Sequence, residues 1–519
     1  QQESRRAVLH PNFVAILALL PVRVPWPPWG PSAPPPPKTS LVLLPFQNAT
    51  GDPAYDGVRS GLASLIRSEL IEAKSLRLVG EDRVQEVFAS LKVPENTEPS
   101  PATTRRIAAL LGAENVLAGR LVRIADRLRI DARLLAAGTS QDGGTASAAA
   151  PGATSIVVDG DSDRAIFTMV DDLTRRVRDR LGIAGGCLEK RRGATELYTR
   201  SVAALSMYGE GLALARAGQE NEAAKRLEQA LQEDPQFHVA RALLAETYDR
   251  LGRSEKAVEE ATKAVAGLGP ASPYEAARIR AVQARLTGNS REALKAYGRL
   301  CEIAPNSAEA FFDLAAEQED AGALEDARKS LLRVLALDPK HPTAHYALGR
   351  LHSRLGKGTE ALEEFGRALA LHTETGNDQG RAAVLNGLGD AYRHLLRRPD
   401  EALNNYQAAL EIRRRIGDRR GVAVTLRNLA MTERDLGRHD EGIRSATEAL
   451  EISREIGDKD GLARGYSELG DIYQIAGRPE DALKAYQESL KVVREIDDPT
   501  SLSHSLANVG YINSVLGRY

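Results

Sequence analysis

The second half of the chain carries a residue pattern that returns in register, and this recurrence limits the fold more than any other feature does. From Met207 onward, small residues return about every 34 residues, with larger apolar residues between them and a proline near the end of several copies. Small side chains let two helices of a hairpin cross closely. The pattern therefore predicts a stack of helical hairpins from about Leu205 to Tyr519. The positions that show it are Gly211, Ala223, Ala230 and Pro235; Leu244, Ala245, Tyr248, Ala257 and Ala264; Ala293, Tyr297 and Pro305; Leu314, Ala315, Ala327 and Pro339; and Leu348, Gly349, Ala361, Phe365 and Ala368.

The period then lengthens. Gly349, Gly389, Ala430, Gly470 and Gly510 hold the same position of successive units, at intervals of 40, 41, 40 and 40 residues. We predict that the added residues follow the second helix of each unit, in segments 375–377, 416–418, 456–458 and 496–498. About nine copies keep matching registers, whereas a chance helical stretch would lose register within two or three. The last copy looks incomplete and the first residue is Gln, so we expect a fragment cut at both ends.

The 34-residue units resemble the tetratricopeptide repeat, and the longer units resemble the arrays of the kinesin light chain type. This resemblance covers residues 188–519. It implies an all-α solenoid, a right-handed superhelix in which the first helix of each hairpin lines a concave groove. It also implies a scaffold that binds a protein or peptide partner there, with no small-molecule substrate and no nucleic acid.

When each repeat is placed in register, the positions expected to face the groove are rich in arginine. Aspartates at positions 390, 435 and 471 lie among them. Arginine forks bind carboxylates through paired hydrogen bonds, so an acidic, extended peptide is one ligand that fits. A solvated charged face explains the same residues and is the simpler interpretation. The predicted partner-binding residues are Arg350, Arg354, Asn386, Arg393, Arg427, Arg434 and Arg464.

Residues 40–187 predict a small α/β domain with a mixed sheet, because short apolar runs alternate with helical periodicity before a hairpin follows. The predicted strands are 41–46, 76–79, 116–122, 128–134 and the edge strand 155–158. Helices are predicted around 58–70, 84–91, 107–111 and 166–177, the third after Pro101 in a first turn. Segment 138–152 is rich in Gly, Ala and Ser and is predicted to be a loop.

A dispersed set of residues in this domain is similar to the TolB-amino-terminal-like (FlgO-like) family. Such domains occur in bacterial multi-domain proteins just after a membrane anchor and before helical repeats, and the family has no established catalytic residues. The residues that carry the resemblance are Leu44, Pro45, Phe46, Asn48, Gly51, Asp52, Pro53, Gly61, Leu62, Leu76, Arg77, Leu78, Val79, Leu111, Gly112, Ala113, Val116, Leu117 and Gly119.

Residues 1–39 form a leader with an apolar patch at 13–20 and a proline-rich segment at 25–37. A helix that spans a membrane needs about 20 mostly apolar residues, so the patch is short for that role. A signal-peptide core remains an alternative, although no clean cleavage site follows. The prolines favour an extended linker over an SH3-type ligand. Localisation therefore stays open between a membrane-anchored bacterial protein with a soluble C-terminal part and a cytoplasmic one.

Composition and motifs point away from catalysis in these residues. The chain has 69 basic and 71 acidic residues, a net charge of −2, and no basic excess typical of nucleic-acid or membrane-surface binders. Cys187 and Cys301 are too far apart to indicate a zinc site, and each is predicted to be a buried, inert thiol. Segment 159–163 resembles the start of a calcium loop, but Arg164 and Val170 stand where glycine and glutamate are needed. We expect no metal, no cofactor and no catalytic residue.

The order of apolar patch, proline-rich spacer, TolB-like domain and repeat array resembles the C-terminal half of bacterial membrane-anchored Ser/Thr protein kinases. The resemblance implies an interaction and sensing module whose catalytic domain lies upstream of Gln1. Similar tails follow adenylate cyclase domains and winged-helix transcription activators, and a standalone cytosolic adaptor is a further alternative. The full-length protein could thus be an enzyme although these residues are not.

Overall fold

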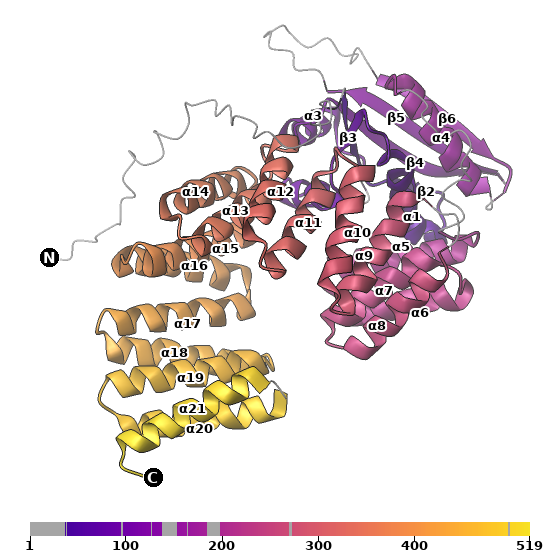
Figure 1. Ribbon diagram of the computed structural model, residues 1–519. Coiled ribbons are helices and arrows are strands. Elements are labelled where there is room, and N and C mark those ends of the chain that lie inside the picture. Colours follow the sequence, from indigo (N-terminus) through magenta and orange to yellow (C-terminus); the bar gives the residue numbers. More distant parts are fainter. Residues whose placement is uncertain are drawn as a thin grey trace, which may run out of the picture. The chain divides into compact units, whose positions relative to one another are not determined.

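The computed structural model describes residues 37, 39–94, 97–125, 127–137, 153–162, 165–183, 198–268, 272–496 and 499–518. The apolar patch at 13–20, nearly all of the proline-rich segment, the predicted loop at 138–152 and Cys187 lie outside these ranges. Within them, every helix is too short or too polar to span a bilayer. An α/β domain with a mixed sheet is followed by a long run of paired helices (Figure 1), which confirms the predicted fold class.

The sheet is mixed because its first half is parallel and its second half is an antiparallel meander. Its strand order is β3-β1-β4-β5-β6, and β2 pairs with β4 beyond the end of β1. β1 is parallel to both β3 and β4, whereas β4, β5 and β6 are antiparallel neighbours. β6 lies at an edge, as predicted. The bounds are β1 Thr39–Leu43, β2 Gln47–Ala49, β3 Leu76–Leu78, β4 Asn115–Ile124, β5 Arg127–Ala136 and β6 Ala153–Gly160.

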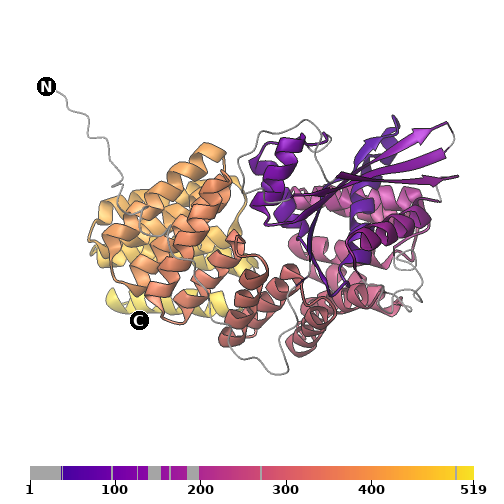
Figure 2. The same ribbon diagram turned by 90° about the horizontal axis from the view of Figure 1, so that it is seen from above.

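Helices cover both faces of this sheet (Figure 2), because successive side chains of a strand point to opposite sides. Leu41 and Leu43 of β1 pack in one core with α1 (Asp56–Leu70) and α4 (Ile166–Arg180). Val42 packs in a second core with α2 (Glu81–Ser90) and α3 (Pro101–Leu110). Ser100 caps α3 by accepting a hydrogen bond from the Thr103 amide at 3.2 Å, with Pro101 in the first turn as predicted.

The first repeats are hairpins of two short helices. In each, the first helix spans 13–15 residues and the second 13 or 14. Cys301 lies buried in one of the second helices, as predicted. The bounds are α5 Val202–Arg216, α6 Glu220–Glu233, α7 His238–Arg250, α8 Ser254–Ala266, α9 Pro273–Leu286, α10 Ser290–Ile303, α11 Ala308–Asp320 and α12 Leu324–Leu337.

Most helices of the later repeats span 17 or 18 residues, and this corrects one prediction. Segments 375–377, 417–418 and 456–458 are turns, but the added residues lie mainly in the helices on either side of them. Most of the predicted segment 496–498 lies outside the described residues. Asn377 and Asp418 each cap the next helix by accepting a backbone hydrogen bond at 2.8 Å. The bounds are α13 Pro342–Arg354, α14 Gly358–Glu374, α15 Asp378–Asp390, α16 Pro399–Ile416, α17 Arg419–Asp435, α18 His439–Glu455, α19 Lys459–Ile475, α20 Pro479–Ile496 and α21 Pro499–Val515.

A π-helical segment, η6 (Ala391–Leu395), continues α15 and accounts for the single interval of 41 residues. A π-bulge adds one residue to a helix. The turn position that is Gly356 in the preceding repeat and Gly437 in the following one is consequently Arg397 here. Arg397 has a positive φ of 53°, as the two glycines do at 72° and 73°.

Glycine and an aromatic ring face each other inside three of the longer repeats. A Cβ atom added at Gly389 would lie 2.5 Å from the Tyr406 ring, and one at Gly470 would lie 2.5 Å from the Tyr486 ring. Gly349 faces Phe365 in the same way, at 2.7 Å. These are the positions at which the sequence predicted close crossing of the two helices.

The α/β domain and the first repeat share one continuous hydrophobic core. Leu62 and Leu65 of α1 are buried together with Leu205 and Tyr208 of α5. The two helices cross so closely that a Cβ atom at Gly57 would lie 2.0 Å from the Ser206 carbonyl oxygen. The first repeat is therefore held against the α/β domain by buried side chains of α1 and α5.

Candidate functional site: a first-helix surface and a domain contact

The seven predicted partner-binding residues all lie on the first helices of their hairpins. Arg350 and Arg354 are on α13, Asn386 on α15, Arg393 on η6, Arg427 and Arg434 on α17, and Arg464 on α19. These first helices also pack against one another, α13 with α15 and α17 with α19. The seven residues consequently belong to one layer of the array, which we call the first-helix surface.

The two arginines of α13 share one acidic partner. Arg350 donates to Glu319 Oε1 at 3.0 Å, and Arg354 donates to the same oxygen at 2.8 Å. Glu319 is on α11, the first helix of the preceding repeat. Both guanidinium groups are about half exposed, whereas the Glu319 side chain is largely buried. The preceding repeat therefore neutralises part of the charge on α13.

A second cluster forms where η6 meets α17. Arg393 Nε donates to Asp435 Oδ2 at 2.7 Å, and Arg434 Nη2 donates to Asp435 Oδ1 at 2.8 Å. Arg434 also lies 3.9 Å from Asp471 of the next repeat. Burial would raise the pKa of the Asp435 carboxyl, but the hydrogen bonds from the two arginines outweigh it and lower that pKa. The two arginines thus stabilise the ionised form of Asp435.

The remaining predicted residues differ in their surroundings. Arg427 binds Glu468 of α19 in the two-pronged geometry, with hydrogen bonds of 2.7 and 2.6 Å. Arg464 is exposed and has no ion-pair partner within the described part of the chain. Asn386 has a buried side-chain oxygen that accepts no hydrogen bond from the described residues. Of the seven, Arg464 alone therefore offers an unneutralised charge.

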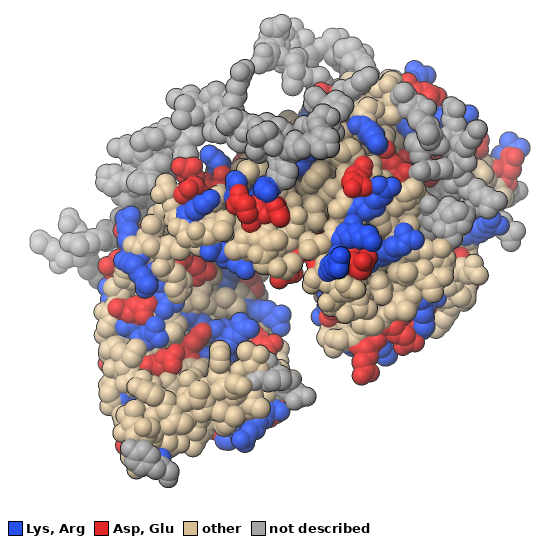
Figure 3. All heavy atoms as spheres, viewed as in Figure 1, with Lys and Arg blue, Asp and Glu red and all other residues tan. Residues whose placement is uncertain are grey.

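Sequence reasoning placed these arginines but missed two of their acidic partners, Glu319 and Glu468. Each partner lies about one repeat from its arginine in sequence: 31 residues separate Glu319 from Arg350, and 41 separate Arg427 from Glu468. A search for opposite charges at one-repeat spacing would have found them. The space-filling view likewise shows basic and acidic side chains interspersed (Figure 3).

The α/β domain makes a further contact that the sequence did not predict. Residues from the end of α1 to α2 bind the start of the first helix in four successive repeats. Each contact falls about 34 residues after the previous one in the array. The contacts are Ser272 Oγ to Glu72 at 2.7 Å, Asn306 Nδ2 to the Lys74 carbonyl at 2.6 Å, Arg83 Nη2 to the Lys340 carbonyl at 2.7 Å, and Asn377 Nδ2 to Glu86 at 3.1 Å. We call this set the domain contact.

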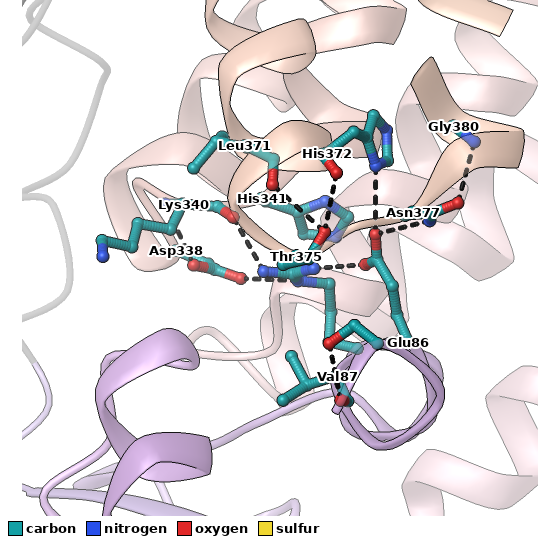
Figure 4. Close-up of polar contacts among 12 residues, drawn as sticks. Glu86, Val87, Asp338, Lys340, His341, Leu371, His372, Thr375, Asn377 and Gly380 are labelled. Atoms are coloured by element: carbon teal, nitrogen blue, oxygen red, sulfur yellow. Dashed lines mark hydrogen bonds and ion pairs between the residues drawn. The ribbon is translucent and has the colours of Figure 1, made fainter. Parts of the chain in front are cut away.

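Arg83 and Glu86 of α2 are the charged centre of the domain contact. Figure 4 shows Glu86 beside His372 and Asn377. Arg83 is 6% exposed, forms an ion pair with Glu86, and donates to Asp338 Oδ2 at 3.3 Å. His372 Nδ1 lies 3.3 Å from Glu86 Oε1. Burial would raise the pKa of Glu86, but contacts with His372, Arg83 and Asn377 outweigh it and lower that pKa to about 2. The ionised form of Glu86 therefore stabilises the folded chain.

This pKa predicts how acid affects the domain contact. The pKa of Glu86 is lower in the folded state than its ordinary value of 4.5, so its stabilisation is complete above pH 4.5 and is lost as the pH falls toward 2. The stabilisation amounts to about 3 kcal/mol. We expect Glu86→Gln to melt below the wild type at neutral pH and to approach it near pH 2. Melting curves across this range measure the difference.

The exposed Glu363, which lies 3.8 Å from Arg367, provides the matched control through Glu363→Gln. Its effect on the melting temperature should be small at every pH. If the difference between wild type and Glu86→Gln stays constant from pH 7 to pH 2, the ionised Glu86 does not stabilise the domain contact.

A cavity of about 550 Å³ lies beside the domain contact, between α2 and the first helices α11, α13 and α15. Its lining includes the carboxylates Asp82, Glu309 and Asp313. Desolvation, together with the charges of neighbouring acidic groups, raises the pKa values of Glu309 and Asp313. The lining also holds Arg77 and Arg83, but its carboxylates outnumber these arginines. A negatively charged ligand is therefore less favoured here than at the arginine-bearing helices α17 and α19.

These features define the class of protein. Residues 202–515 form paired helices stacked in register, which is an α-solenoid. The chain belongs to the tetratricopeptide-repeat family, which matches residues 214–286, 281–342, 341–415 and 421–495, together more than half of its length. It is accordingly a protein–protein interaction scaffold that binds protein or peptide partners, and its repeat architecture is non-catalytic.

Several solved structures show a distant likeness to the chain. No curated protein matches the chain. Among solved structures, MamA is similar at 24% identity and a TM-score of 0.29, over 34% of this chain and 96% of that one. BtubC from P. vanneervenii is similar at 21% identity and 0.34, over 43% and 91%. A Rap protein complexed with competence and sporulation factor is similar at 13% identity and 0.40, over 60% and 98%.

Proposed function

We propose that the array binds an acidic, extended segment of a partner protein on the first-helix surface of η6, α17 and α19. The observation that supports this most is the Arg427–Glu468 pair, in which a guanidinium of this surface already holds a carboxylate through two hydrogen bonds. A ligand carboxylate can take the same geometry at the exposed Arg464 without displacing any acidic group of the described chain.

The affinity must come from several contacts together. Exposed ion pairs contribute about 0–1 kcal/mol each, and a ligand has to compete with Asp435 and Glu468 for the other arginines. Met431 and Tyr466 are partly exposed near these groups and can support a ligand through apolar contact. We therefore expect moderate affinity and strong dependence on salt, because screening limits charge interactions to about 8 Å at physiological ionic strength.

Charge reversal at Arg393, Arg427 and Arg434 tests the proposal. The variant Arg393→Glu/Arg427→Glu/Arg434→Glu should lose at least about tenfold in affinity for a fluorescent polyglutamate peptide, since opposite charges become like charges. Fluorescence anisotropy at two salt concentrations measures this. The control Arg299→Glu changes an exposed arginine of the second helix α10, which pairs with Glu302. Binding that persists unchanged in the triple variant and in high salt would mean that these arginines form only a solvated face.

We further propose that the chain is the non-catalytic C-terminal part of a bacterial signalling protein, with a Ser/Thr kinase domain upstream. The order of segments and the similarity of the α/β domain to the TolB-amino-terminal-like family support this. An adenylate cyclase or a winged-helix transcription activator in that position, or a standalone adaptor, are the alternatives. The sequence upstream of Gln1 distinguishes them, because a kinase has a Gly-rich loop and catalytic-loop motifs there.

A further inference from the structure

A second cavity, of about 220 Å³, lies where the α/β domain packs against α5, the first helix of the array. Leu43 and Pro45 at the carboxyl end of β1 form one wall. The other walls are side chains of α1, of α2 and of the last turn of α5. This volume is below the roughly 300–1,000 Å³ of typical ligand pockets, so it suits only a small ligand.

Its position follows from the topology of the sheet. β1 lies between β3 and β4 and is parallel to both. The chain reaches β3 through α1 on one face and then reaches β4 through α2 and α3 on the other face. The order of strands thus reverses at β1. In open α/β sheets, ligands bind in the crevice that such a reversal leaves beyond the carboxyl ends of the strands.

The charged side chains that line this crevice are mainly basic. Arg59 and Arg67 come from α1 and Arg216 comes from α5. Among the described residues of the lining, Glu81 of α2 is the one carboxylate. Glu81 accepts a hydrogen bond from Arg216 at 2.6 Å and lies 3.9 Å from Arg67. Arg67 also lies 3.6 Å from Glu309, outside the lining. Glu81 therefore lies between two of the three lining arginines, Arg216 and Arg67, and Arg67 Nη2 also donates to the Val79 carbonyl at 2.6 Å.

We propose that this crevice binds a phosphate group, either as inorganic phosphate or as part of a small phosphomonoester. A ligand must displace the tethered Glu81 from Arg216 and Arg67. A phosphate carries nearly two charges at neutral pH and accepts from several arginine forks at once, whereas a monocarboxylate offers no more than Glu81 already does. Because its walls come from both the α/β domain and α5, a bound phosphate would strengthen the junction between that domain and the array.

Titration calorimetry on the full chain tests this, with inorganic phosphate, glycerol phosphate and acetate at constant ionic strength. We expect one saturable site for phosphate and none of similar affinity for acetate. Glu81→Gln should tighten phosphate binding, because the internal competitor loses its charge. Arg216→Gln and Arg59→Gln should each weaken it about tenfold or more. Arg105→Gln, an exposed arginine of α3 bonded to its own helix, is the control that should bind as the wild type does.

Thermal melting with and without phosphate accompanies each titration and shows that each variant is folded. Phosphate should raise the melting temperature of Glu81→Gln more than that of the wild type. Equal binding of glycerol phosphate would identify the phosphate group of a metabolite as the ligand, and binding of inorganic phosphate alone would identify the free ion. No saturable binding to either wild type or Glu81→Gln would overturn the proposal, as would equal binding by Arg216→Gln, Arg59→Gln and the wild type.

Discussion

Replacing Arg83 with methionine is expected to destabilise the chain by about 3–5 kcal/mol, the largest effect of any single change proposed for this protein. Arg83 is buried, and its guanidinium is the ion-pair partner of both Glu86 and the buried Asp338. Methionine keeps much of the apolar stem but removes the guanidinium that pairs with both carboxylates. The cost is therefore the unpaired buried charge and not the loss of volume.

Thermal unfolding of Arg83→Met beside Arg226→Met measures this effect. Arg226 is half exposed and pairs with Glu210 at 2.9 Å, so its replacement should change stability by no more than about 1 kcal/mol. The Arg83 variant should also expose the α2 segment to limited proteolysis before the repeats unfold. Coincident melting curves for the two variants would show that the domain contact does not stabilise the chain.

The second large effect is expected at Gly389. An alanine there would place its Cβ about 2.5 Å from the buried Tyr406 ring, so the ring or the helix must move. Overpacking of this kind costs about 1–3 kcal/mol. Leucine at this position should cost more. In a solenoid the loss acts on neighbouring interfaces, so melting should broaden and begin locally.

Gly366 of α14 is the matched control, because a Cβ atom there would meet nothing within 4 Å. Gly366→Ala should stabilise the helix by about 0.5–1 kcal/mol, so the same substitution is expected to have opposite signs at the two positions. A Gly389→Ala variant that melts at or above the wild-type temperature would mean that the two helices do not cross at Gly389.

The sequence allowed much of the fold to be predicted because its signals are local or periodic. Small residues at fixed spacing placed the hairpins, and short apolar runs alternating with helical periodicity predicted the α/β domain with its mixed sheet. The location of the added residues was wrong, because two longer helices and one longer loop give the same interval. The interval of 41 residues revealed an insertion, but only the structure shows that it is a π-helical turn at Ala391–Leu395.

The candidate site was predicted less completely, for a different reason. Register placed the arginines on first helices, but their partners depend on how neighbouring repeats are packed. The domain contact joins residues as far apart as Glu86 and Asn377, which are separated by 291 positions. No local pattern marks such a pair. The same holds for the arginine crevice, which combines α1 with α5 across the junction between the α/β domain and the array.

The central claim is that the first-helix surface of the repeats is the partner-binding surface. The most direct test is hydrogen exchange with and without a saturating acidic peptide. The measurement reports protection along the whole chain. We predict that protection increases on α17 and α19 around Arg427 and Arg464 and stays unchanged on the second helices α18 and α20. Protection confined to the second helices, or no change anywhere at a peptide concentration that saturates binding, would contradict it.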